Sequence, residues 1–190
     1  MADYDQIIYD VAIQNGFTPT AAKLVVAQAR FESADYTSNV FKNNLNTSGM
    51  KYIGQALATR GTLAPLSERS TTCKNGGVCV NSDYYAKFQS VADSAKDKIE
   101  RNYNKTLGGV TPQQLKNAQS ADEFAALLKK RNYYGAPQSQ YATGLKAKLL
   151  KVNILQFVKK NPKTSSGIGI LVAGLIVYYI YYVTKIVKRQ

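Results

Sequence analysis

The 190-residue chain contains no histidine and no tryptophan. Without histidine, neither Ser-His nor Cys-His nucleophilic catalysis is available, and every histidine-ligated zinc site is excluded. Acidic residues are also scarce, at 12 Asp and Glu in total. The glutamates are Glu32, Glu68, Glu100 and Glu123. Chemistry that depends on a carboxylate must therefore use one of these residues or one of the few aspartates.

Cysteine is nearly absent as well, because the chain has only Cys73 and Cys79. Two thiols cannot complete a metal site alone, so we expect neither a metal nor a cofactor. Between them lies Asn75-Gly76-Gly77, which is typical of a tight turn. One expectation is a disulfide across the base of a short hairpin, which would imply exposure to an oxidising environment. The alternative is a pair of free thiols near a loop.

Positive charge, by contrast, is abundant. The chain has 25 Lys and Arg and a formal net charge of +13. Such a charge favours anionic partners, for example nucleic acid, anionic lipid or cell-wall polymers. The basic residues are scattered along the chain and match no nucleic-acid-binding module, so we do not expect nucleic acid as a partner.

A long uncharged segment covers residues 165–184. At a rise of about 1.5 Å per residue, a helix of this length spans about 30 Å, enough to cross the hydrocarbon core of a bilayer. We therefore predict a transmembrane helix over 165–184, with a linker over 159–164 and a basic tail over 185–190. The alternative is a buried core helix. The last third of the segment holds tyrosines of the kind found in interfacial aromatic belts: Tyr178, Tyr179, Tyr181 and Tyr182.

Basic residues flank both ends of this segment, so the positive-inside rule does not orient it. The first ten residues have neither a basic start nor an apolar run, and we expect no secretory signal there. These features predict a protein with a single C-terminal membrane anchor. Its N-terminal part, residues 1–158, would lie on one side of the membrane.

Residues 1–158 are predicted to form a mainly α domain with a small β-hairpin lobe. Apolar residues recur at helical spacing, and capping signals such as Thr18-Pro19 mark helix starts. Residues 50–86 lack helical periodicity and are assigned to the lobe. The predicted helices cover residues 4–14, 18–33, 90–103, 120–130 and 145–159, with a short helix that begins at Thr111-Pro112.

Four sequence blocks occur in an order that is typical of one known family. They are QARFES (28–33), NNLNTSGMK (43–51), YAKFQSVADSAKD (85–97) and the segment 128–148, which begins LKKRNYYG. Together they resemble the glucosaminidase family of peptidoglycan hydrolases, whose domain is a lysozyme-like α+β fold. Three positions depart from the family pattern: Ala34 replaces a glycine, residues 46–49 replace an aromatic-glycine block, and Gln89 replaces a common arginine.

The resemblance implies that Glu32 is the general acid. A carboxyl group at a helix end beside an apolar side chain such as Phe31 can retain the proton that this role requires. A second acid in the lobe is implied for hydrolysis, with Glu68 as the first candidate and Asp83 as its competitor. The third option is no second acid at all, as in lytic transglycosylases.

The resemblance also implies residues that contact the sugar. Tyr133 matches a tyrosine of the closing block that lines the sugar site, and Tyr134 takes its place if the register shifts by one. Tyr85 and Asn46 are further candidates for substrate binding, although Tyr85 fits the core about as well. Tyr141 is expected to pack in the core.

The implied activity is cleavage of the glycan backbone of peptidoglycan. N-acetylglucosaminidase is the first expectation, and lytic transglycosylase or muramidase follows. The other class is a catalytically silent, membrane-anchored protein that binds the wall. A chain with an anchor and no export signal fits the virion membrane of a membrane-containing bacteriophage, with other virion proteins as further partners; a bacterial cell membrane is the alternative location.

Overall fold

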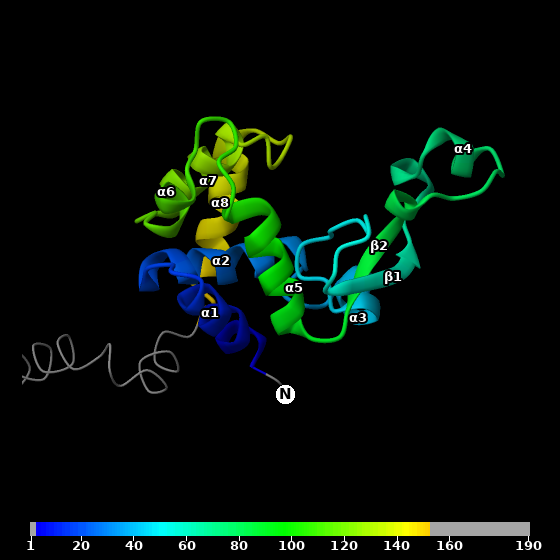
Figure 1. Ribbon diagram of the computed structural model, residues 1–190. Helices are drawn as coiled ribbons and strands as arrows, with labels where there is room; N and C mark the ends of the chain where they lie inside the picture. Colours follow the sequence, from blue (N-terminus) through cyan, green and yellow to red (C-terminus); the bar gives the residue numbers. More distant parts are fainter. Residues whose placement is uncertain (1–2, 153–190) are drawn as a thin grey trace, which may run out of the picture. The chain divides into compact units, whose positions relative to one another are not determined.

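The computed structural model describes residues 3–152, and local signals in the sequence explain where its first helices begin and end (Figure 1). Helix α1 (Tyr4–Gln14) ends at Asn15, and Gly16 follows with a φ of 84°. Helix α2 (Pro19–Glu32) begins at Thr18, whose hydroxyl accepts a hydrogen bond from the Ala21 N–H. Both helices have the predicted limits to within a residue or two.

A two-stranded antiparallel sheet forms the β lobe. Strand β1 (Ala58–Leu63) pairs with β2 (Tyr84–Phe88), and helix α3 (Asn39–Asn44) packs against both. The pairing is irregular between Arg60 and Leu63, where a side chain at Gly61 would collide with Asn44. The predicted lobe over 50–86 is confirmed, but helix α3 was not predicted.

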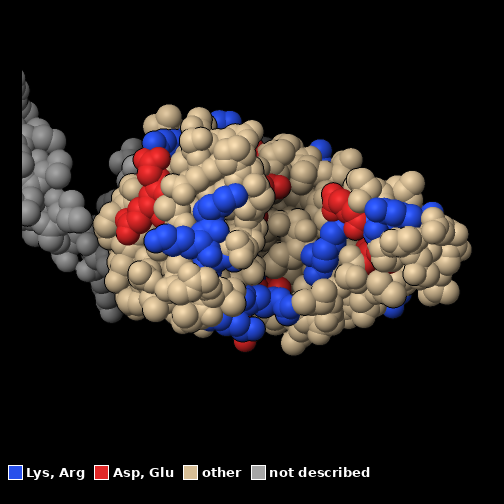
Figure 2. Space-filling model, turned by 90° about the horizontal axis from the view of Figure 1, so that it is seen from above, with Lys and Arg blue, Asp and Glu red and all other residues tan. Residues whose placement is uncertain are grey.

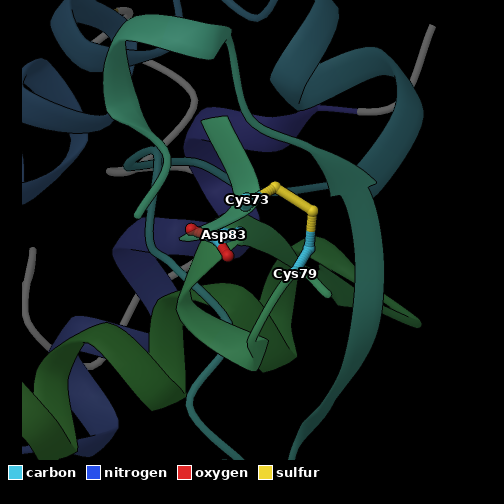
Figure 3. A group of neighbouring side chains, drawn as sticks. All are labelled: Cys73, Cys79 and Asp83. Atoms are coloured by element: carbon cyan, nitrogen blue, oxygen red, sulfur yellow. A yellow bond between two sulfur atoms is a disulfide. The ribbon is translucent and has the colours of Figure 1, made fainter. Parts of the chain in front are cut away.

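The cysteine segment differs from the predicted hairpin turn. It lies in a long excursion between the two strands, made of η1 (Leu66–Glu68), α4 (Thr71–Lys74) and η2 (Asn81–Asp83). The Ser70 hydroxyl caps α4, so Asn75 and Gly76 end a helical turn instead of joining two strands. The disulfide between Cys73 and Cys79 is present, but it braces this excursion and does not lie across a hairpin base (Figure 3).

The remaining helices follow the lobe. Helix α5 (Val91–Lys98) continues into a π-helical turn, η3 (Ile99–Tyr103), and α6 (Pro112–Lys116) and α7 (Ala121–Lys130) come next. These confirm the predicted starts at Ser90, Thr111 and Ser120. Ser120 accepts from the Glu123 N–H as a capping box requires, but the Glu123 carboxylate accepts from the Gln119 N–H instead of the Ser120 N–H.

The last helix differs from its prediction. Helix α8 covers Gln138–Leu149, not 145–159, because the chain turns at Pro137 and the first turns of α8 bury Tyr141 and Ala142. Residues 153–159, the linker, the predicted transmembrane helix and the basic tail lie outside the described residues. Within 3–152, no helix is both long and apolar enough to cross a membrane.

Helix α2 lies at the centre of the helical part, where it packs against α1 and α8 (Figure 1). Its inner residues are almost fully buried, and they include Ala21, Leu24, Val25 and Gln28. The chain then turns sharply, because three consecutive residues after Ser33 (34–36) all have positive φ. Position 34 is where the family pattern has glycine, and the φ of 52° at Ala34 explains that preference.

The turn over 34–36 is tied to the end of α8 by charge. The Asp35 carboxylate accepts from Lys148 Nζ at 2.8 Å and from Lys151 Nζ at 2.9 Å. Partial burial raises the pKa of Asp35, but these two hydrogen bonds outweigh it and hold the pKa at about 2. The ion pairs therefore favour the charged carboxylate and fasten α8 to the end of α2.

Because the folded pKa of Asp35 is lowered, its contribution to stability is present above pH 4 and is lost as the pH falls towards 2. We predict that Asp35→Asn lowers the free energy of unfolding at pH 7 by about 1 kcal/mol, after solvent screening. It should also weaken the pH dependence of stability between pH 4 and pH 2. Urea titrations across this range measure both effects.

Asp122→Asn is the matched control, because the Asp122–Lys146 pair is 62% and 56% exposed and should contribute little. Equal losses in the two variants would contradict the assignment.

Candidate active site

Glu32 is the last residue of α2, and its side chain is 15% exposed. Oε1 accepts hydrogen bonds from Gln28 Nε2 at 2.9 Å and from the Tyr141 hydroxyl at 2.7 Å. Oε2 accepts from the Tyr133 hydroxyl at 3.0 Å and from Lys98 Nζ at 3.3 Å. An ionised carboxylate has about four acceptor positions, so these donors match its capacity and fix its orientation.

A buried second layer supports these donors. The Tyr103 hydroxyl donates to Gln28 Oε1, while Gln28 Nε2 also donates to the Tyr141 hydroxyl at 2.9 Å. Gln28 and Tyr103 are both fully buried. Burial, followed by the negative charge of Glu32, raises the pKa of the Tyr103, Tyr133 and Tyr141 hydroxyls. All three therefore act as neutral hydroxyls around the carboxylate.

Lys98 supplies the positive charge at this site. It is 1% exposed, and its ammonium lies 5.7 Å from the centre of the Tyr133 ring and 6.0 Å from that of Tyr103. Burial lowers the pKa of Lys98, while the charge of Glu32 acts in the opposite direction. The site is thus a buried cation and a nearly buried anion, surrounded by tyrosines.

Close packing of α8 on α2 brings Tyr141 to Glu32. The Tyr141 ring meets Phe31 edge-on at a centroid distance of 5.3 Å. One turn along α8, Gly144 faces the same Phe31 ring, and any side chain there would collide with it. Tyr134 stacks on the Tyr141 ring at a centroid distance of 3.8 Å, and its hydroxyl donates to the Ala125 carbonyl.

We predict that Gly144→Ala lowers the free energy of unfolding by about 1–3 kcal/mol, because the added methyl group displaces Phe31 or α8. The matched control is Gly135→Ala, since nothing lies within 4 Å of the methyl group that it adds. Chemical denaturation of both variants measures the difference. A Gly144→Ala variant as stable as the control would show that α8 does not depend on this close approach.

Glu68 lies in a separate cluster in the β lobe, at the end of η1, and its side chain is 47% exposed. Lys51 Nζ lies 2.7 Å from Glu68 Oε2, and the Tyr85 hydroxyl donates to the same oxygen at 2.9 Å. Lys51 also lies over the Tyr85 ring, 4.2 Å from its centre. The hydrogen bond from Lys51 lowers the pKa of Glu68, and burial opposes it only in part. Glu68 is therefore an accessible, ionised carboxylate.

Asp83 has a different environment. It is 1% exposed and accepts from the N–H and hydroxyl of Ser70 and from the Val80 N–H. The Ser70 N–H is the main cause of its lowered pKa. Asp83 lies beside Cys73 and Cys79, but both thiols are consumed in the disulfide (Figure 3). This group of side chains therefore holds the lobe together and offers no free set of metal ligands.

Asn46 lies in the core of the lobe, fully buried. Its Nδ2 donates to the carbonyls of Met50 and Ala86, and its Oδ1 accepts from the Ser48 and Met50 N–H groups. All four hydrogen-bonding positions of the amide are used within the protein. The structure thus gives Asn46 the task of holding the loop over 46–50 against β2 and leaves it no polar atom for a ligand.

Figure 2 shows a hollow in the surface between the helical part and the projecting β lobe, with Lys and Arg side chains along its edges. Of the predicted residues, the structure brings Tyr133 to Glu32 and Tyr85 to Glu68. Tyr134 is linked to the side chains around Glu32 through its stacking on Tyr141.

Lys98, Lys51 and the hydroxyl role of Tyr141 were not predicted from the sequence. For Lys98 a signal existed. It lies at helical spacing from Val91 and Ala95, on the face of α5 that is buried. A lysine at such a position needs an anionic partner inside the protein.

No protein-family model matches the chain, and no curated protein matches it. Among solved structures, the catalytic domain of the autolysin Auto from Listeria monocytogenes matches with a TM-score of 0.51 and 21% sequence identity. The match covers 83% of this chain and 89% of that domain. At this identity the likeness concerns the fold. The predicted mainly helical domain with a small β lobe is confirmed, and it is the fold of that autolysin catalytic domain.

Proposed function

We propose that this protein cleaves the glycan backbone of peptidoglycan, with Glu32 as the general acid. The observation that carries the proposal is the Glu32 carboxyl group, which is 15% exposed at a helix end and held by donors from four side chains. A general acid needs a carboxyl group held in a fixed orientation, and these donors hold it. On binding, the glycosidic oxygen would take the place of one of them at the carboxyl group. The shared fold with an autolysin catalytic domain supports the cell wall as the substrate.

Hydrolysis also requires water to be activated, and Glu68 is suited to that role. Its lowered pKa keeps it ionised at neutral pH, as a general base must be, and its side chain is 47% exposed. In this reading, Glu32 protonates the glycosidic oxygen while Glu68 removes a proton from the attacking water. The expected product is a strand with N-acetylglucosamine at its reducing end, as an endo-β-N-acetylglucosaminidase would give.

The basic surface supports an anionic substrate. The chain has a net charge of +13, and Figure 2 shows basic side chains around the hollow, with fewer acidic ones among them. Peptidoglycan carries carboxylates, so this charge favours association with the wall.

One observation favours lytic transglycosylase activity as the second candidate. Glu68 forms an ion pair with Lys51 at 2.7 Å and accepts from Tyr85, so part of its capacity to take a proton from water is already used. A transglycosylase needs no such base, because a hydroxyl group of the sugar replaces water. Its products end in 1,6-anhydro sugars.

We predict that Glu32→Gln lowers the rate of wall cleavage at least about 100-fold, because the amide cannot donate the proton. If Glu68 is the base in hydrolysis, Glu68→Gln should lower the rate of wall cleavage by a similar factor. The matched control is Glu123→Gln, since Glu123 is an exposed residue at the start of α7. Clearance of purified walls, with mass spectrometry of the products, measures both rate and bond specificity.

Anhydro products together with an active Glu68→Gln variant would assign the transglycosylase reaction. Equal clearance by wild type and Glu32→Gln would contradict the role of Glu32. A wild-type chain that binds walls without cleaving them would instead be a catalytically silent wall-binding protein.

For the location of the enzyme, we propose a single C-terminal membrane anchor over residues 165–184, in the virion membrane of a membrane-containing phage. This proposal rests on the uncharged sequence of that segment and the basic residues that flank it. Other virion proteins would then be neighbours of the enzyme. Absence of this chain from purified particles, measured by mass spectrometry, would exclude the virion and favour a bacterial cell membrane.

Removal of residues 162–190 should convert a protein that requires detergent into one that does not, because the uncharged segment is lost. Wall cleavage should persist, since Glu32 and Glu68 remain. Flotation with lipid vesicles compares the two forms. A truncated protein that still floats with lipid would contradict the anchor.

A further inference from the structure

A π-helical turn joins α5 to the loop that follows it, and this turn shapes the active site. The Asn104 N–H donates to the Ile99 carbonyl at 2.9 Å, a bond between residues five apart. Such π turns are rare and are frequent at functional sites. In a regular α-helix, side chains five residues apart point about 140° away from each other. In a π turn they lie nearly on the same face.

Lys98 and Tyr103 are also five residues apart across this turn, and both belong to the group of side chains around Glu32. Lys98 Nζ lies 3.3 Å from Glu32 Oε2, and the Tyr103 hydroxyl donates to Gln28, which in turn donates to Glu32. The extra residue of the π turn is therefore what allows one helix to supply both a cation and a hydroxyl to the same site.

Lys98 pairs with Glu32 and with no other carboxylate in the described part of the chain. Its neighbour in sequence, Asp97, pairs instead with Arg101 at 3.8 Å. The other groups that face the pair are neutral hydroxyls, those of Tyr103, Tyr133 and Tyr141, with Arg131 lying beyond Tyr103. Lys98 is thus the charged group that acts directly on Glu32.

The donors around Glu32 are not equivalent chemically. A tyrosine hydroxyl can accept a hydrogen bond as well as donate one, so it can turn to face a protonated carboxyl group. An ammonium group has no acceptor, and its charge favours the ionised carboxylate. Lys98 therefore opposes the protonated form of Glu32 that acid catalysis requires.

We propose that Lys98 is a positioning residue that orients Glu32 and sets the upper pH limit of its action as an acid. The inference rests on the proposed function for its kinetic consequence, while its electrostatic basis is independent of substrate.

The kinetic test compares pH–rate profiles of the full chain. In Lys98→Met, which keeps the bulk of the side chain without its charge, the descending limb should move up by at least about one pH unit. Lys98→Arg keeps the charge and should leave the limb within a few tenths of a unit of wild type. Lys96→Met is the matched control, because Lys96 is exposed on the same helix and should cause no shift.

The substrate-free test is a ¹³C NMR titration of the glutamate side-chain carboxyls in the full chain. The sequence has few glutamates, so the signal of Glu32 is assigned by comparison with Glu32→Gln. Its titration midpoint should rise by at least about one pH unit in Lys98→Met and stay unchanged in Lys96→Met. Should Lys98→Met fail to fold, Lys98→Gln takes its place with the same expected shift.

A folded, uncharged variant at position 98 with the wild-type midpoint for Glu32 would overturn the inference. A raised midpoint in a protein that cleaves no wall would uphold the role of Lys98 and refute the proposed function. The titration therefore tests the role of Lys98, and the cleavage assay tests the proposed function.

Discussion

An anion and a cation that are both almost removed from water must be compensated inside the protein, and the helical part of this structure is arranged around that requirement. The Glu32 side chain is 15% exposed and that of Lys98 is 2% exposed, so neither can rely on solvent. Their mutual pairing is supplemented by hydroxyl and amide donors from α2, from the segment after α7 and from α8. Loss of one member leaves the other buried and unpaired.

Three backbone features follow from this constraint. Gly144 lets α8 approach α2 closely enough for Tyr141 to reach the carboxylate. The π turn aligns Lys98 and Tyr103 on one face of their helix. The residues of positive φ after Ser33 end α2 abruptly and leave Glu32 at its last position. The β lobe is held by different means, namely the disulfide, the buried Asp83 carboxylate and the Asn46 amide, and the Glu68 carboxylate lies exposed on it.

Part of the fold could be predicted from the sequence, because side chains at the helix ends act on the backbone next to them. Thr18-Pro19, Ser120 and Asn15-Gly16 act through their immediate neighbours, so the limits of α1, α2 and α7 could be predicted closely. Glu32 and Tyr133 were identified through a family resemblance. The pairing of Lys98 with Glu32 and the hydroxyl role of Tyr141 depend on contacts between residues 66 and 109 positions apart. The helical spacing of Lys98 indicates its burial on α5, but no local pattern identifies the partner of either residue. The start of α8 was missed because its first turns are held by burial of Tyr141 and Ala142 and not by a side-chain cap.

In the proposed reaction, the Glu32 carboxyl group must meet a glycosidic oxygen of the bound strand. The most direct measurement is a crystal structure of the Glu32→Gln variant with a bound oligomer of alternating N-acetylglucosamine and N-acetylmuramic acid. We expect a glycosidic oxygen about 2.6–3.2 Å from the substituted side chain, with the strand lying in the hollow between the helical part and the β lobe. A strand bound elsewhere, with the substituted side chain still enclosed by Tyr133, Tyr141 and Lys98 and out of reach of any sugar oxygen, would contradict it.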